Sequence, residues 1–278
     1  MWSLDAMADS LAAAIASHEA ALRREQAVHG LDALQEVDIH PLLAPALRTI
    51  DSRDADMPLT VLREQPYPHE WLRKARKSVF TGVEILPEHR DRQRCDLVLI
   101  EPPGVRLDDQ LLQQKAVRKR KRAAEGTLFE SLAVAEAENG ATGPEFRGTR
   151  GLASDPRATQ GLAVRPEDAF WLEVKVVAQH GLTDGVLGPN RSYAAELSRG
   201  PLADLAKLAA DERVVHAAAL VVLFTDTQAT AQHDLSILLH KCLDRELPVC
   251  SPVLRHVSVL DRLGNAVCTV CLVGVRGW

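Results

Sequence analysis

The chain has 278 residues, of which 46% are hydrophobic and 26% charged, a composition typical of a globular protein rather than a disordered or fibrous one. Its formal net charge of −5 gives no general attraction for nucleic acid, so such binding requires local basic patches. Aromatic residues make up only 4%, which argues against a base-stacking surface. No apolar run reaches the roughly 18 residues of a membrane span, and charges interrupt residues 1–20, so we expect a cytoplasmic protein with no membrane partner.

Residues 1–65 are predicted to form an N-terminal helical region. Residues 10–34 are rich in Ala, Leu, Glu and Arg, which favour helices. The following segment, HPLLAPALRTI, contains Pro41 and Pro45, which are expected to break the helix. The region shows no obvious chemistry, and we place the core domain at residues 66–278.

The core is predicted to belong to the α/β class, with a mixed central β-sheet flanked by helices. Apolar segments predict strands, and two amphipathic segments, PLADLAKLAADE and ATAQHDLSILLHKCLDREL, predict helices between them. The expected strands are RCDLVLI, AFWLEVKVV, VVHAAALVVLF, VLRHVSVL and AVCTVCLVGV. Residues 105–168 are charged and helical at first and then rich in Gly and Pro, so we interpret them as a long helical and loop insertion.

Two charged residues occur in the apolar strand WLEVKVV. Side chains alternate along a strand, so Glu173 and Lys175 project from the same face. Charged residues are rarely buried unless they are paired or bound to a metal. The simplest alternative is a Glu–Lys ion pair on an exposed or edge strand.

A second carboxylate, Asp96, begins the strand DLVLI. If this strand lies next to WLEVK, Asp96 approaches Glu173, and the two carboxylates repel each other unless a divalent cation neutralises them. Oxygen ligands of this type suit Mg²⁺, with Mn²⁺ as a substitute. Lys175 would then orient or deprotonate the attacking water, or stabilise charge on a phosphate, which indicates phosphodiester hydrolysis.

These residues resemble the PD-(D/E)XK nucleases, the restriction-endonuclease-like superfamily. The resemblance consists of Glu70 in a helix, Asp96 at the start of an apolar strand, and Glu173 and Lys175 in the next core strand. Cys95 precedes Asp96 where the family often has Pro, and the insertion lengthens the usual spacing. The resemblance implies a restriction-endonuclease-like fold, metal binding by Asp96, Glu173 and Glu70, and assistance of the nucleophilic water by Lys175.

Basic residues cluster at two places in the sequence. Arg73, Lys74 and Lys77 share a helix face with Glu70, where they either neutralise it or direct phosphates to the site. The run KAVRKRKR is either a solvated helix or an arm that contacts phosphates. The nucleic-acid-binding candidates are Arg73, Lys74, Lys77, Lys119, Arg120, Lys121 and Arg122.

Two functions are consistent with this pattern. The first is a Mg²⁺-dependent DNA endonuclease, which would act as a homodimer if it cuts both strands. The second is a non-catalytic nucleic-acid-binding or interaction protein that keeps a nuclease-like fold. Separation of the Asp96 strand from the Glu173 strand would favour the second.

Overall fold

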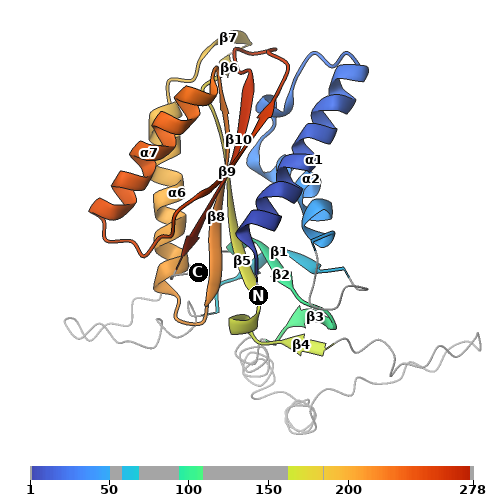
Figure 1. Cartoon of the computed structure of the whole chain (residues 1–278), viewed down its shortest axis with the longest axis vertical. Helices are drawn as coiled ribbons and strands as arrows, with labels where there is room; N and C mark the ends of the chain where they lie inside the picture. Colours follow the sequence, from blue (N-terminus) through green and yellow to red (C-terminus); the bar gives the residue numbers. More distant parts are fainter. Residues whose placement is uncertain (1, 51–57, 69–93, 109–161, 184, 276–278) are drawn as a thin grey trace, which may run out of the picture.

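The computed structural model describes residues 2–50, 58–68, 94–108, 162–183 and 185–275. In this part of the chain a six-stranded sheet lies between two pairs of helices (Figure 1). One face is covered by α1 (Leu4–Arg24) and α2 (Glu36–Arg48), and the other by α6 (Tyr193–Ala210) and α7 (Gln228–Asp244). Among the helices described, none has both the length and the apolar character needed to cross a membrane.

The sheet has the strand order β1-β2-β5-β8-β10-β9. Its strands are β1 (Thr60–Pro66), β2 (Arg94–Ile100), β5 (Phe170–Ala178), β8 (His216–Thr225), β9 (Val253–Ser258) and β10 (Val267–Val275). β5 and β8 are parallel and are connected through α6, whereas every other neighbouring pair is antiparallel. The predicted α/β class and mixed central sheet are therefore confirmed.

Short elements lie outside the main sheet. β3 (Gly104–Leu107) pairs in parallel with β4 (Leu162–Val164), and β6 (His180–Thr183) pairs with β7 (Val186–Pro189). Two 3₁₀ helices, η1 (Leu31–Ala33) and η2 (Pro166–Asp168), complete the described elements. Because β3 and β4 are neighbours, the two described ends of the predicted 105–168 insertion lie side by side.

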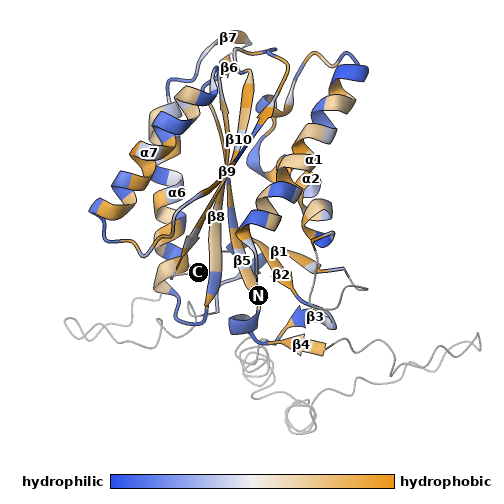
Figure 2. Cartoon of the chain, viewed as in Figure 1, coloured by the Kyte–Doolittle hydropathy of each residue, from blue (hydrophilic) through white to orange (hydrophobic). Residues whose placement is uncertain are grey.

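The central strands consist largely of apolar residues, as the hydropathy colouring shows (Figure 2), and these residues are buried in a core on each face of the sheet. Along β5, Leu172 and Val174 pack in the core beneath α1 and α2. Trp171 and Val177 pack in the core beneath α6 and α7. This alternation confirms the predicted strand and gives Glu173 and Lys175 a shared side of the backbone.

The prediction that Pro41 and Pro45 break the N-terminal helix is wrong, because both lie inside α2. The two prolines are exposed and four residues apart, so water can hydrate the carbonyl groups that lose their helical hydrogen bonds. The opposite face of α2 is buried on the sheet, and this packing outweighs the cost of the prolines. The helical region expected over residues 1–65 also ends early, because its last residues, from Thr60, form β1.

Candidate active site

The candidate site lies where β2 and β5 separate. Their pairing spans only three residues on each strand and ends at Leu97 and Leu172, whereas β5 pairs with β8 along its whole length. Just beyond this point, the backbone N–H of Val174 donates a hydrogen bond to Asp96 Oδ2, at 2.7 Å. The Asp96 side chain therefore accepts a backbone hydrogen bond from β5 just past the last paired residues of the two strands. This bond holds the Asp96 carboxylate beside Glu173.

Asp96 and Glu173 are both buried, with exposed fractions of 9% and 2%. Burial, together with the negative charges of Asp204 and Asp96, raises the pKa of Glu173 to about 8. Burial also raises the pKa of Asp96, although hydrogen bonds from Glu173 and from the Val174 N–H oppose the shift. Near neutral pH the pair of carboxyl groups therefore retains a proton, because the nearby lysines do not supply enough positive charge for both to ionise.

Lys175 contacts carboxylates from both helical layers. Its Nζ lies 2.9 and 3.0 Å from the two oxygens of Glu36 in α2, and 3.4 Å from Asp204 Oδ2 in α6. Burial lowers the pKa of Lys175, but the hydrogen bond to Glu36 and the charges of Asp204 and Glu36 outweigh it and raise the pKa overall. Lys175 is therefore a cation that can stabilise negative charge, rather than a base.

Glu36, His40 and Asp96 form a group that could hold a metal ion, since one ligand atom from each lies within 4.8 Å of the others. His40 is only 1% exposed, and neither ring nitrogen has a hydrogen-bond partner among the described residues. Burial and the positive charges of Arg63 and Lys175 lower the pKa of His40, so its imidazole is neutral. Two carboxylates and a neutral imidazole are ligands for divalent first-row metals.

A second group of contacts holds Glu173 from the side of α6. Lys207 Nζ lies 3.1 Å from Glu173 Oε1 and 2.6 Å from Asp204 Oδ1. The hydroxyl of Tyr67 also donates to Glu173 Oε1, and the Tyr67 ring stacks on Trp171. We use the name Asp96 cluster for seven of the residues gathered here, without Tyr67: Glu36, His40, Asp96, Glu173, Lys175, Asp204 and Lys207.

The Asp96 cluster is not electrically balanced. It contains four carboxylates and two lysines, and its histidine is neutral. If every carboxylate is ionised, the excess is two negative charges, which equals the charge of one divalent cation. Carboxylates gathered without compensating charge raise one another's pKa, and a bound cation reverses that shift.

The structure brings together three of the predicted site residues, Asp96, Glu173 and Lys175. Glu70 lies outside the described residues, and the helical carboxylates that the structure places in the cluster are Glu36 of α2 and Asp204 of α6. The predicted nucleic-acid contacts, Arg73, Lys74, Lys77, Lys119, Arg120, Lys121 and Arg122, also lie outside the described residues.

Sequence reasoning missed the residues that the flanking helices contribute. Glu36 and His40 are four positions apart, which places them on one helix face, but the region holding them was assigned no chemistry. Asp204 and Lys207 occur on the buried side of α6, among Leu202, Leu205 and Leu208. Charged residues at apolar positions of an amphipathic helix were the available signal.

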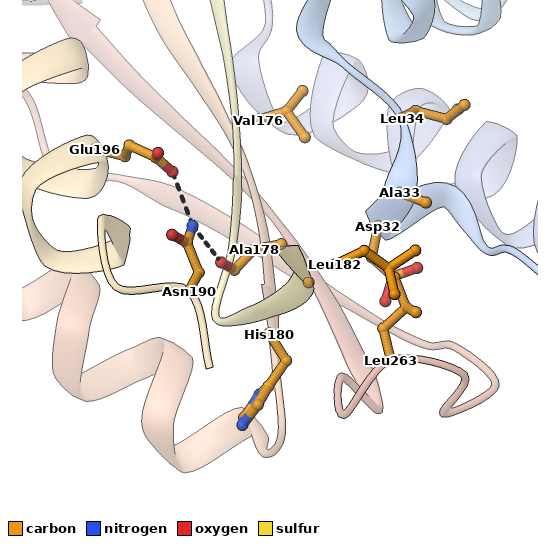
Figure 3. A pocket seen from close by; sticks show the side chains of 11 residues that line it. Asp32, Ala33, Leu34, Val176, Ala178, His180, Leu182, Asn190, Glu196 and Leu263 are labelled. Carbon is orange, nitrogen blue, oxygen red and sulfur yellow. Dashed lines mark hydrogen bonds between the residues drawn. The ribbon is translucent and has the colours of Figure 1, made fainter. Parts of the chain in front are cut away.

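A separate hollow of about 320 Å³ lies near the other end of β5 (Figure 3). Its lining includes Val176, His180 and two acidic residues, Asp32 and Glu196. Glu196 accepts a hydrogen bond from Asn190, which also donates to the Ala178 carbonyl. No Lys or Arg is among the described lining residues, so the hollow offers a phosphate no compensating charge.

No protein-family model, curated protein or solved structure matches the chain. The geometry and charge of the Asp96 cluster are therefore the basis for assigning a function.

Proposed function

We propose that the protein hydrolyses phosphodiester bonds in nucleic acid, as a metal-dependent DNA endonuclease with a restriction-endonuclease-like fold. The observation that supports this most directly is that Asp96 lies within 4.8 Å of ligand atoms of Glu36 and His40 and beside Glu173, while Lys175 contacts Glu36. The strands of Asp96 and Glu173 are neighbours, as the resemblance to PD-(D/E)XK nucleases requires. The mixed sheet between helices also agrees with that fold.

Asp96, Glu36 and His40 are the proposed metal ligands, a change from the set Asp96, Glu173 and Glu70 expected from the resemblance. The metal would be Mg²⁺ or Mn²⁺, and we expect Mn²⁺ to bind more tightly because imidazole is a better ligand for it. A divalent cation held there would supply Lewis-acid stabilisation of charge on the phosphate. Neither ring nitrogen of His40 has a hydrogen-bond partner among the described residues, and this supports the ligand set, because a buried polar group without a partner is costly.

The remaining residues supply fixed charge and orientation. The Lys175 ammonium stabilises the negative charge that develops on the phosphate as the water attacks. Glu173 is held in place by Lys207 and Tyr67. It forms a hydrogen bond with Asp96 and so orients the Asp96 carboxylate. The basic residues predicted to contact the DNA backbone, in residues 73–77 and 119–122, complete the proposal.

The test is cleavage of supercoiled plasmid DNA with Mg²⁺ or Mn²⁺ by wild-type protein, Asp96→Asn and Lys175→Met. Removing one group that stabilises a transition state typically lowers the rate by about 10²-fold or more, and we expect losses of that size. Asp244→Asn and Lys241→Met make the same chemical changes at exposed positions of α7 and should cleave like wild type.

Chelation of the metal should abolish cleavage. Equal cleavage by wild type, Asp96→Asn and Lys175→Met would show that the activity is a contaminant. A wild-type protein that binds DNA without cutting it under either metal would instead identify a non-catalytic binding protein.

A further inference from the structure

Asp204 lies between the two lysines of the Asp96 cluster. It is 4% exposed, and its Oδ1 is 2.6 Å from Lys207 Nζ. Its Oδ2 accepts no hydrogen bond from the described residues, although Lys175 Nζ is 3.4 Å away. One oxygen of a buried carboxylate is thus anchored, while the other is oriented towards Lys175 and remains available.

Lys175 currently has a closer partner. Both oxygens of Glu36 contact its Nζ, at 2.9 and 3.0 Å. Glu36 is also one of the three candidate metal ligands. A carboxylate that binds a divalent cation cannot keep a two-oxygen contact with an ammonium group, because the two positive charges would lie within a few ångströms and repel each other. Lys175 therefore needs another acceptor when the metal site is filled.

We propose that Asp204 is that acceptor, and that Lys175 exchanges Glu36 for Asp204 when a divalent cation binds to Glu36, His40 and Asp96. Asp204 is then the residue that positions the Lys175 ammonium in the metal-bound protein. This inference depends on the metal position given under the proposed function, and it adds a positioning role for a residue of α6.

The surroundings of Lys175 allow the exchange. Its aliphatic stem already lies against α6 at Gly200, where an added Cβ would be 3.2 Å from Lys175 Cδ. Lys207 contacts Asp204 from the position three residues later on the same helix and so fixes the carboxylate. Lys175 Nζ lies about 3 Å from the oxygens of Glu36 and 3.4 Å from Asp204 Oδ2. The exchange therefore needs only a small movement of the ammonium group and no change in the backbone.

A double-mutant cycle of metal affinity tests the exchange. The dissociation constant of Mn²⁺ is measured for wild type, Lys175→Met, Asp204→Asn and the double variant. We expect Lys175→Met to bind Mn²⁺ about tenfold more tightly, because the competing cation on Glu36 is gone. Asp204→Asn should weaken binding about tenfold when Lys175 is present, and clearly less when it is replaced.

The contradicting result is an equal effect of Asp204→Asn in both backgrounds, since Asp204 would then act only through its charge at a distance. Asp204→Glu, which keeps the charge, should recover most of the affinity. A wild-type protein that binds no Mn²⁺ would overturn the exchange as well.

A second measurement follows the Lys175 ammonium group directly rather than through metal affinity. The side-chain ammonium signal of Lys175, observed by NMR with Mg²⁺, should persist in wild type because Asp204 shields it from exchange with water. In Asp204→Asn it should broaden on adding Mg²⁺ but not before. A signal that broadens in wild type on adding Mg²⁺ would reject the exchange.

The two proposals can fail separately. Cleavage of DNA together with an additive cycle would leave the proposed function intact and reject the exchange. Coupling between Lys175 and Asp204 without cleavage of any nucleic acid would reject the proposed function and keep the exchange.

Discussion

Two buried charged clusters of this protein differ in how their charges are balanced. The first, which we call the Glu19 cluster, consists of Glu19, Arg23 and Arg262. Glu19 Oε1 accepts hydrogen bonds from Arg23, from Arg262 and from the backbone N–H of Leu260, each at 2.9–3.0 Å. Although burial acts to raise the pKa of Glu19, these hydrogen bonds lower it overall. The cluster joins α1 to the turn between β9 and β10.

The Asp96 cluster is also largely buried, but the pKa values of Glu36, Asp96 and Glu173 are shifted the other way. Burial and neighbouring carboxylates raise the pKa of Glu173 to about 8, and in the part of the chain that the structure describes both ring nitrogens of His40 lack a hydrogen-bond partner. In the Glu19 cluster, Arg262 Nη2 is the only buried side-chain nitrogen or oxygen without a hydrogen-bond partner among the described residues. A cluster whose carboxylate is satisfied stabilises the fold, whereas one with excess negative charge and vacant ligand atoms is suited to a cation.

The largest effect on stability is expected from Arg262→Met. The side chains of Arg262 and Glu19 are only 5% and 3% exposed, so the substitution leaves a buried carboxylate without its main partner. Breaking a buried pair in this way costs about 3–5 kcal/mol, and we expect about 3 because Arg23 still contacts Glu19. Urea unfolding measures the loss.

Arg255→Met is the matched control for this prediction. Arg255 forms ion pairs with Asp5 and Asp9, whose side chains are mostly exposed, and pairs of this kind contribute little. If Arg262→Met and Arg255→Met lost equal stability, burial would not strengthen the ion pairs of the Glu19 cluster, and the comparison between the clusters would fail.

The next effect is stabilisation by a bound cation. A ligand at a hundred times its dissociation constant stabilises the folded state by about 2.7 kcal/mol, and we expect Mn²⁺ to do this for wild type. Asp96→Asn and His40→Gln should lose most of this gain, because each removes a proposed ligand. Unfolding curves with and without Mn²⁺ measure it.

Arg262→Met is informative here too, because it should keep the Mn²⁺ gain while losing stability. If Mn²⁺ stabilised wild type, Asp96→Asn and His40→Gln equally, the metal would bind at another position. This result would contradict the proposed ligand set.

The sequence predicted the sheet better than it predicted the helices around it. The strand RCDLVLI coincides with β2, because a run of apolar residues buried on both faces leaves no other assignment. The helix prediction was wrong at Pro41 and Pro45, which lie inside α2. Local helix propensity takes no account of the burial of the opposite face of this helix on the sheet.

The same limit explains which site residues were found. Glu173 and Lys175 were identified from strand alternation alone, and Asp96 from its place at the start of a neighbouring strand. Glu36, His40 and Asp204 come from helices, and which helix face meets a given strand end depends on tertiary packing. The vacant His40 nitrogens and the charge imbalance are likewise properties of the packed structure.

The third expected effect concerns pH; it is the smallest when taken per pH unit, and it distinguishes the two clusters by sign. The folded-state pKa of Glu173, about 8, exceeds the value of 4.5 expected for an unfolded chain. Folded protein therefore holds the proton while unfolded protein releases it, so stability falls as pH rises from 4.5 to 8. Without metal, Glu173→Gln removes this fall, so its stability relative to wild type should rise with pH over this interval, by at most about 1.4 kcal/mol for each pH unit.

Glu19→Gln should behave in the opposite way. The folded-state pKa of Glu19 is lowered, so its contribution to stability is present above pH 4.5 and disappears as the pH falls through the folded-state pKa. This variant should be less stable than wild type at neutral pH and approach it in acid. Unfolding series from pH 4 to 9 for both variants provide the check, and a gain of Glu173→Gln that did not grow with pH would mean that the Asp96 cluster carries no unbalanced charge.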